Sequence, residues 1–296
     1  MTYKSAETGE RLDKFLAAHT ENLTRTAAAH LIESGSCTVN GKRTAKNYKL
    51  RAGDEVSLTI PEAKPVGIIP EEMPIEIVYE DRDLLIVNKP RKVVVHPAHG
   101  NRSGTLVNFL MHHCGDSLSG INGEIRPGIV HRIDKNTSGL LLAAKNDFTH
   151  TRLAEQLKKH SVKREYQAVV SGAVKEPGII SAPIGRHKIR RKEMTVNGLN
   201  PREAITHYDV IRNYENAAHL RVRLETGRTH QIRVHMAYIG HPVLGDDVYG
   251  NGKPKWLEGQ CLHAYKLGFT HPRTGEYMEF ESGLPEYFLK LLRQLR

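Results

Sequence analysis

Cysteine is scarce in this chain of 296 residues, and no stretch is apolar enough to cross a bilayer. The three cysteines, Cys37, Cys114 and Cys261, are odd in number and lie far apart. This argues against a disulfide framework and fits a reducing compartment. Residues 1–10 are polar and lack the apolar h-region of a secretory signal, and no apolar run approaches the roughly 18 residues that span a membrane. We therefore expect a soluble cytoplasmic protein.

Repeats and low-complexity tracts are absent as well, and the composition is that of a globular protein, with 39% hydrophobic and 26% charged residues. A chain of 296 residues fits one large domain or two ordinary ones. The charge balance is more informative, because 43 Lys and Arg against 33 Asp and Glu leave a net charge of +10. Such an excess favours a polyanionic partner, most often nucleic acid, over the alternative of a merely basic protein.

Residues 10–60 predict a compact module of two short helices followed by a small sheet. The apolar residues within 12–16 share one helical face, and Thr24 is placed to cap a second helix. Residues 55–60 alternate with the period of a strand.

This module resembles the small RNA-binding domain named after ribosomal protein S-four. The resemblance rests on four stretches: Arg11-Leu12-Asp13, Leu23-Thr24-Arg25-Thr26, Gly35 and Val39-Asn40-Gly41. The family more often has Ser at positions 24 and 26, and Thr keeps the hydroxyl. The resemblance and a basic run at residues 42–51 indicate phosphate contacts by Arg25, Lys42 and Arg43. The alternative is a structural module with a solvated basic loop.

Four prolines within fourteen residues mark a linker after the module: Pro61, Pro65, Pro70 and Pro74. This spacing favours an extended, semi-stiff connector at residues 61–74. The sequence therefore predicts a second domain over residues 75–296.

The second domain reads as mixed α and β. Strands are expected at residues 75–79, 84–87, 140–144, 166–170, 204–211, 218–224 and 262–269, and helices at residues 105–113 and 147–160, the latter capped by Asp147. Strands and helices do not alternate regularly, so a doubly wound parallel sheet is disfavoured. We expect an α+β fold with a large, mixed and mostly antiparallel sheet.

Residues 128–141 form a polar loop between apolar flanks, with cations, a carboxylate and two hydroxyls close together. A sheet edge that presents such a loop can hold a reactive carboxylate rigidly. The stretch His131-Arg132-Ile133-Asp134-Lys135-Asn136-Thr137-Ser138-Gly139 resembles the signature His-Arg-Leu-Asp-x-x-Thr-Ser-Gly of the RluA family of RNA pseudouridine synthases. Ile133 replaces the usual Leu, which is a volume-conserving change.

Three later segments resemble further elements of this family in order and spacing: Lys163-Arg164-Glu165-Tyr166, residues 226–236 and residues 240–246. The resemblance covers residues 75–280. It implies an enzyme that breaks the bond between uracil N1 and ribose C1′, turns the base, and rejoins it through C5. This chemistry involves no redox change and no group donor, so no cofactor is expected.

The resemblance also assigns roles. Asp134 would be the essential carboxylate, either as a nucleophile or as a base, and the pattern leaves both open. Arg233 would be the cation that keeps this carboxylate charged and oriented. Tyr166 would stack on uracil and is a candidate for handling the C5 proton. Arg132 would contact RNA and fill the space left by the extruded base.

Two further groups are expected to support the site. His131, Thr137 and Ser138 would orient the catalytic loop, the hydroxyls through bonds to the backbone. Five cations in seven residues would contact the RNA backbone by counterion release: Arg186, Lys188, Arg190, Arg191 and Lys192. The alternative for these five is a solvated, mobile loop.

A metal site is not expected. His230 and His235 are five residues apart rather than four, and no Cys or acidic partner accompanies them. We expect them to bond neighbouring backbone or to pack in the core. Asp246-Asp247 is read as a turn after Gly245. The segment around Ser138 lacks the Gly-x-Ser-x-Gly elbow of a hydrolase.

The sequence therefore predicts a monomeric enzyme that isomerises uridines in structured RNA. The pairing of the N-terminal module with this catalytic domain favours large-subunit ribosomal RNA, with transfer RNA as the alternative. A non-catalytic RNA-binding or ribosome-assembly protein of the same fold is a competing interpretation, and a metal-dependent nuclease is another. Retention of Asp134, Tyr166 and Arg233 argues against the non-catalytic protein.

Overall fold

The structure is a computed structural model. It describes residues 1–6, 8–20, 23–60, 68–97, 101–121, 127–250, 252, 254 and 256–296. The chain divides into two compact units, Met1–Val66 and Gly67–Arg296. Part of the expected connector, residues 61–67, lies outside the described residues, and Pro70 and Pro74 lie in a segment without helix or strand.

The first unit contains two helices and three strands: β1 (Thr2–Lys4), α1 (Leu12–His19), α2 (Arg25–Glu33), β2 (Cys37–Val39) and β3 (Glu55–Leu58). Its sheet has the order β1-β3-β2, and both pairs are antiparallel. The expected cap is confirmed, because Thr24 Oγ1 accepts a hydrogen bond from the Ala27 amide at 3.2 Å. Strand β3 ends two residues earlier than expected, and β1 was not predicted.

The second unit is built on a nine-stranded sheet. Its strands are β4 (Glu76–Glu80), β5 (Leu84–Lys89), β6 (Ser138–Ala144), β7 (Lys163–Ser171), β8 (Gly178–Ser181), β12 (Ile205–Asn213), β13 (Ala217–Leu224), β14 (Leu262–Thr270) and β15 (Tyr277–Glu281). Eight strands follow the order β4-β5-β6-β14-β7-β13-β12-β8, and β15 pairs with β14. The β6–β14 pair is parallel and the other pairs are antiparallel. The expected mixed, mostly antiparallel sheet is confirmed.

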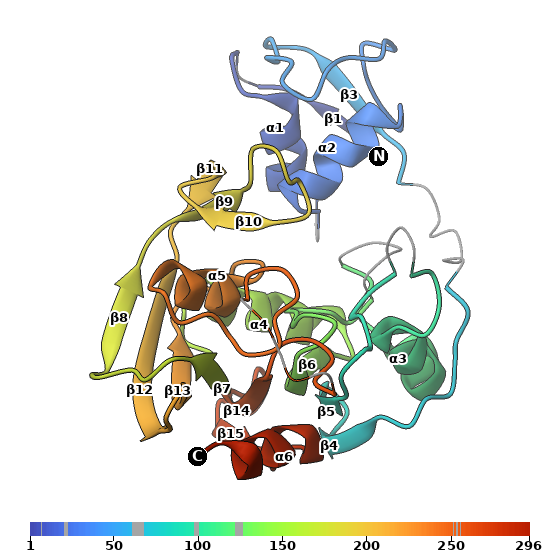
Figure 1. The fold of residues 1–296 in the computed structure, drawn as a ribbon. Helices are drawn as coiled ribbons and strands as arrows, with labels where there is room; N and C mark the ends of the chain where they lie inside the picture. The colour runs from blue at the N-terminus through green and yellow to red at the C-terminus, as the bar shows by residue number, and fades with distance from the viewer. Residues whose placement is uncertain are drawn as a thin grey trace. The chain divides into compact units, whose positions relative to one another are not determined.

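The remaining elements of the second unit are α3 (Leu106–Cys114), the short η1 (Gly115–Ser117), α4 (Asp147–Lys158), β9 (Ile184–Arg186), β10 (Met194–Val196), β11 (Leu199–Arg202), α5 (Gln231–Tyr238) and α6 (Glu286–Gln294). Strands β9, β10 and β11 form a separate three-stranded sheet, which lies near α5 in Figure 1. Val234 of α5 packs with Ile184 and Met194 of this sheet. No helix in the described ranges is long and apolar enough to cross a membrane.

The expected cap of α4 is wrong by one residue. Asn146 caps the helix, because its side chain accepts a hydrogen bond from the Thr149 amide at 3.0 Å. The Asp147 carboxylate instead accepts hydrogen bonds from Ser119 Oγ at 2.8 Å and from the Gly120 amide at 3.1 Å. Both side chains can cap a helix, and the tertiary contact decides between them.

Strand β6 positions the polar loop that precedes it. All seven residues of β6 are buried, as its continuous apolar run predicted. Gly139 has φ +113°, and a Cβ there would lie 2.2 Å from the Ala264 carbonyl oxygen of β14. Glycine is therefore required where β6 begins beside β14, which explains the last residue of the His-Arg-Ile-Asp-x-x-Thr-Ser-Gly stretch.

Candidate active site

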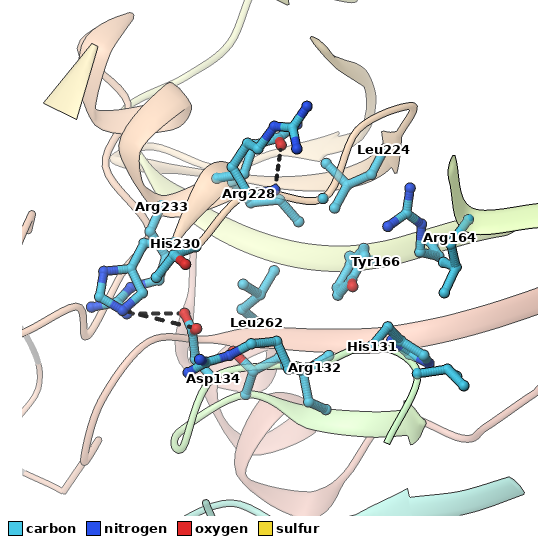
Figure 2. Close-up of a pocket in the computed structure, with 18 of the residues that line it drawn as sticks. His131, Arg132, Asp134, Arg164, Tyr166, Leu224, Arg228, His230, Arg233 and Leu262 are labelled. Carbon is cyan, nitrogen blue, oxygen red and sulfur yellow. Dashed lines mark hydrogen bonds and ion pairs between the residues drawn. The ribbon is translucent and has the colours of Figure 1, made fainter. Parts of the chain in front are cut away.

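Asp134 lies in a turn just before β6, and its backbone carbonyl accepts a hydrogen bond from the Thr137 amide at 3.1 Å. Its carboxylate meets the guanidinium of Arg233, which lies in the first turn of α5. The Arg233 Nη1–Asp134 Oδ2 distance is 3.0 Å, and the two residues are 99 positions apart. The exposed fractions of these side chains are 16% for Asp134 and 7% for Arg233. Figure 2 shows the contact.

Arg233 is held from its other side by Asp246. Arg233 Nε donates to Asp246 Oδ2 at 2.6 Å, and Nη2 donates to Oδ1 at 2.9 Å. The amides of Val248 and Tyr249 also donate to Asp246 Oδ1. Burial opposes charge on both partners, but the Asp246–Arg233 pairing lowers the pKa of Asp246 and raises that of Arg233. One guanidinium thus bridges two carboxylates in a fixed orientation.

A cavity of about 530 Å³ opens beside Asp134, a volume typical of a small-ligand site. Tyr166 of β7 lines it with an exposed fraction of 7%, and burial raises the pKa of its hydroxyl. Leu262 lines the same cavity and is labelled with Tyr166 and Asp134 in Figure 2, so part of the cavity wall is apolar. Arg164 and Arg228 also line the cavity. The arrangement suits a flat, partly polar ligand near an anionic group.

His230 also lines this cavity and faces Asp134, with 3.9 Å between His230 Nε2 and Asp134 Oδ1. Its Nδ1 is 2.9 Å from the Tyr249 hydroxyl. Burial lowers the pKa of His230, against the opposing effect of the Asp134 charge. The sequence predicted a core or backbone-bonding role, so this placement of His230 corrects the prediction. His235 does fill the predicted role, since its ring bonds Thr206 Oγ1 and the Ala182 carbonyl.

Comparison with known proteins decides the family. Residues 83–238 match the family model of RNA pseudouridylate synthase. An uncharacterized RNA pseudouridine synthase of Bacillus subtilis is 50% identical over 297 residues, covering 100% of this chain and 97% of that protein. The chain belongs to the RNA pseudouridylate synthase family. It is an RNA-modifying isomerase.

Other comparisons of this synthase agree. Residues 10–56 match the S4 domain. The ribosomal large subunit pseudouridine synthase D of Zymomonas mobilis is 44% identical, with 97% of this chain and 94% of that protein covered. The solved structure of human RNA pseudouridylate synthase domain containing 1 is 28% identical with a TM-score of 0.59, covering 75% of this chain and 88% of that chain. The predicted family and fold are confirmed.

Lys89 of the synthase lies beside the loop that carries Asp134 and is fully buried. Its ammonium group donates to three backbone carbonyls, those of Pro90 at 2.7 Å, Val93 at 2.8 Å and Lys135 at 3.2 Å. Burial lowers the pKa of Lys89 to about 7, although the Asp134 charge opposes this. The sequence analysis missed Lys89, although a lone Lys at the end of the apolar strand 84–89 was a visible signal.

His131, Thr137 and Ser138 were expected to orient the loop of Asp134, and the partners of the two hydroxyls differ from those expected. His131 Nε2 accepts a hydrogen bond from the Leu142 amide of β6 at 3.0 Å, and burial lowers the pKa of His131 to about 3. The expected hydroxyl-to-backbone bonds of Thr137 and Ser138 are wrong. Thr137 Oγ1 accepts from the Gln260 side chain, and Ser138 Oγ bonds His263 Nδ1 and the Tyr287 hydroxyl. The backbone of β6, which begins at Ser138, is already paired within the sheet, so the Ser138 hydroxyl meets side chains.

Asp246 was read only as part of a turn, and its role in holding Arg233 was missed. The Asp246 carboxylate accepts hydrogen bonds from Arg233 and from the amides of Val248 and Tyr249. The candidate group of metal ligands in the described ranges is Asp81, Asp83 and His271. Asp81 and Asp83 precede β5, at the opposite end of that strand from Lys89, and His271 follows β14. Asp83 already binds Arg273.

The predicted RNA-binding residues are exposed. Arg132 lines the cavity beside Asp134. The other predicted RNA-binding residues of the second unit lie at or after the end of β9. Arg186 is the last residue of this strand, and Lys188, Arg190 and Arg191 follow it. This segment is internally bonded, since Arg186 Nη1 donates to the Arg191 carbonyl at 2.8 Å and Arg190 pairs with Glu193 at 3.2 Å. It is therefore a structured turn whose cations project outward.

In the first unit, the side chains of Lys42 and Arg43 are exposed. Arg25 is more constrained, because its Nε donates to the buried carboxylate of Asp13 at 3.0 Å. Arg11 binds the same carboxylate with two hydrogen bonds. Two arginines share the one carboxylate of Asp13, so this group keeps a net positive charge.

Proposed function

We propose that this protein isomerises uridines of large-subunit ribosomal RNA to pseudouridine, with Asp134 as the catalytic carboxylate. The observation that carries the proposal is the Asp134–Arg233 ion pair beside a cavity of about 530 Å³ that Tyr166 lines. The substrate assignment is supported by relatives called ribosomal large subunit pseudouridine synthase D, 44% identical in Zymomonas mobilis and 40% identical in Pseudomonas aeruginosa.

The geometry suits a carboxylate that must react while charged. Arg233 contacts Oδ2 of Asp134, which leaves Oδ1 for the substrate. The guanidinium is itself fixed by Asp246, so it cannot rotate away when the substrate enters. A preorganised cation of this kind stabilises charge without reorganising during the reaction. Oδ1 can then act as a nucleophile toward carbon or as a base.

The cavity suits a uracil that has left its stack. Tyr166 and Leu262 provide an apolar wall for the base, and an aromatic ring stacks well on an extruded base. Arg132, exposed beside the cavity, would contact the RNA from which the base departs. The isomerisation moves one proton from C5 to N1 as the glycosidic bond changes partner, so its atoms balance without a cofactor.

RNA affinity would come from cations outside the cavity. The proposed contacts are Arg25, Lys42 and Arg43 in the module 10–60, and Arg186, Lys188, Arg190 and Arg191 in the catalytic domain 75–296, with residues 61–74 as connector. Such phosphate contacts are independent of sequence and weaken with salt. We further propose that the protein acts as a monomer on ribosomal RNA in the cytoplasm.

Pseudouridine mapping tests this proposal. Unmodified large-subunit ribosomal RNA and transfer RNA are each treated with wild type, Asp134→Ala or Asp134→Asn, and stops are read by carbodiimide primer extension. We expect product on ribosomal RNA with wild type and loss with both variants. Asn keeps the size of the side chain and so separates charge from packing. Undiminished product from Asp134→Ala would overturn the catalytic assignment, and product confined to transfer RNA would overturn the substrate assignment.

A further inference from the structure

His230 has an uncommon backbone conformation, and its ring lies beside Asp134. It immediately precedes α5 with φ +57° and ψ 20°, in the left-handed region, which a residue with a side chain occupies at a cost. This conformation accompanies a ring whose Nε2 lies 3.9 Å from Asp134 Oδ1. The distance is too long for a direct hydrogen bond, and it places a ring nitrogen next to the oxygen that Arg233 does not contact.

The other ring nitrogen of His230 is controlled by Tyr249. The Tyr249 hydroxyl accepts a hydrogen bond from the Met194 amide at 2.8 Å and lies 2.9 Å from His230 Nδ1. A backbone amide only donates, so the hydroxyl oxygen is the acceptor there and its own proton is left for another partner. Within the described ranges, His230 Nδ1 is the acceptor available to that proton.

This pattern favours one tautomer of the neutral imidazole. If Nδ1 accepts from Tyr249, a neutral ring must carry its hydrogen on Nε2, the nitrogen that faces Asp134. The titratable and charged groups that face the ring are Asp134, Arg132, Arg233, Asp246 and Tyr249. The two arginines and burial favour the neutral ring, whereas the two carboxylates oppose it.

We propose that Tyr249 is a positioning residue that holds His230 as the Nε2–H tautomer, so that a neutral hydrogen-bond donor faces Asp134 and the substrate atoms bound there. A charged imidazolium at this distance would form an ion pair with Asp134 Oδ1 and compete with the substrate. A neutral donor can bridge to a substrate oxygen without removing the negative charge. The proposal rests on the proposed catalytic role of Asp134.

Tyr249 is well anchored for this task. Its backbone amide donates to Asp246 Oδ1 at 3.1 Å, and its ring centroid lies 5.1 Å from Arg233 Cζ. One aromatic residue therefore touches Arg233 through its ring and His230 through its hydroxyl. Tyr249→Phe removes the hydroxyl alone and keeps the ring beside Arg233, so it separates the two contacts.

The direct test is nitrogen-15 NMR of histidine-labelled protein. His230→Gln identifies the His230 signals by their loss, and His235, whose ring is bonded by other groups, serves as the unchanged control. We expect the Nε2–H tautomer in wild type and loss of that preference in Tyr249→Phe. A wild-type Nδ1–H tautomer, or an unchanged His230 signal in a folded Tyr249→Phe protein, would overturn the proposal.

Kinetics provide a second measurement. Gln can place an amide donor where Nε2–H lies, whereas Asn cannot reach it, so His230→Gln should retain more single-turnover activity than His230→Asn. We expect Tyr249→Phe to lower kcat about tenfold with little change in KM, the loss associated with one hydrogen bond, and to have little further effect in the His230→Gln background. Equal activity of the Gln and Asn variants, or additive losses, would contradict the proposal.

Different results would refute the proposed function and the positioning role of Tyr249. Full activity of Asp134→Asn would refute the proposed function. The NMR result for Tyr249 and His230 is read without turnover, so it tests the tautomer whatever Asp134 does. A correct tautomer with unaltered kcat in Tyr249→Phe would refute the positioning role while leaving the catalytic carboxylate in place.

Discussion

Asp246→Asn is the variant that tests the arrangement of the site most directly. Asp246 accepts two hydrogen bonds from Arg233, and its exposed fraction is 4%. An amide in its place loses the charge and turns one acceptor into a donor that faces the guanidinium. Removing one partner of a buried ion pair costs about 3–5 kcal/mol, and Arg233 retains Asp134, so we expect about 3 kcal/mol.

That loss is large enough to measure in two ways. For a unit of this size, about 3 kcal/mol corresponds to a fall in Tm of roughly 6–12 °C. A guanidinium displaced by about 1 Å should also lower the single-turnover rate about a hundredfold, because catalysis depends on orientation. Urea unfolding gives the stability, and pseudouridine formation at saturating enzyme gives the rate.

Asp247→Asn is the matched control, since it removes the same charge from the next position, where the side chain is exposed. We expect it to unfold close to the wild-type midpoint. An Asp246→Asn protein with the wild-type midpoint and rate would show that Asp246 does not hold Arg233. A stability loss without a rate loss would limit Asp246 to folding.

Two further predictions concern Lys89 and Gly139, which lie beside the loop that carries Asp134. The pKa of Lys89 is about 7 in the folded chain against an ordinary 10.5, so the unfolded chain binds more protons between these values and the free energy of unfolding should rise with pH there. Lys89→Met should remove this rise in urea unfolding; parallel pH curves for both proteins would contradict it. Gly139→Ala should cost about 3 kcal/mol or more through positive φ and overlap with Ala264. Gly275→Ala, with positive φ but open space, should cost less; equal losses would contradict the overlap.

Prediction from the sequence was most accurate for segments whose surroundings are reflected in a single sequence pattern. Strand β6 is buried on both faces, so its continuous apolar run identified it. Asp134, Tyr166 and Arg233 were found by resemblance, and the structure brings all three to one cavity. Their proximity itself could not be derived from the spacing, because Arg233 lies 99 positions from Asp134 and only the tertiary fold brings the two together.

Some residues and elements were not predicted from the sequence, for physical reasons. His230 and Asp246 contact side chains outside their own sequence segments, and those segments resemble an ordinary core segment and an ordinary turn. Strands β8 to β11 were missed because each has only three or four residues, too few for a clear alternation. Helix α6 was overlooked although its apolar residues repeat with helical period, including the buried Phe288 and Leu291.

Lys89 has a consequence for how the synthase selects its substrate. The carbonyl after Asp134 is tied to an ammonium group that has no access to water, so the reacting loop is already ordered before RNA arrives. We therefore expect the deformation on binding to fall mainly on the nucleic acid. Uridines that leave their stack cheaply, in bulges, hairpin tips and weakly paired stretches, should be converted faster than uridines in long duplexes.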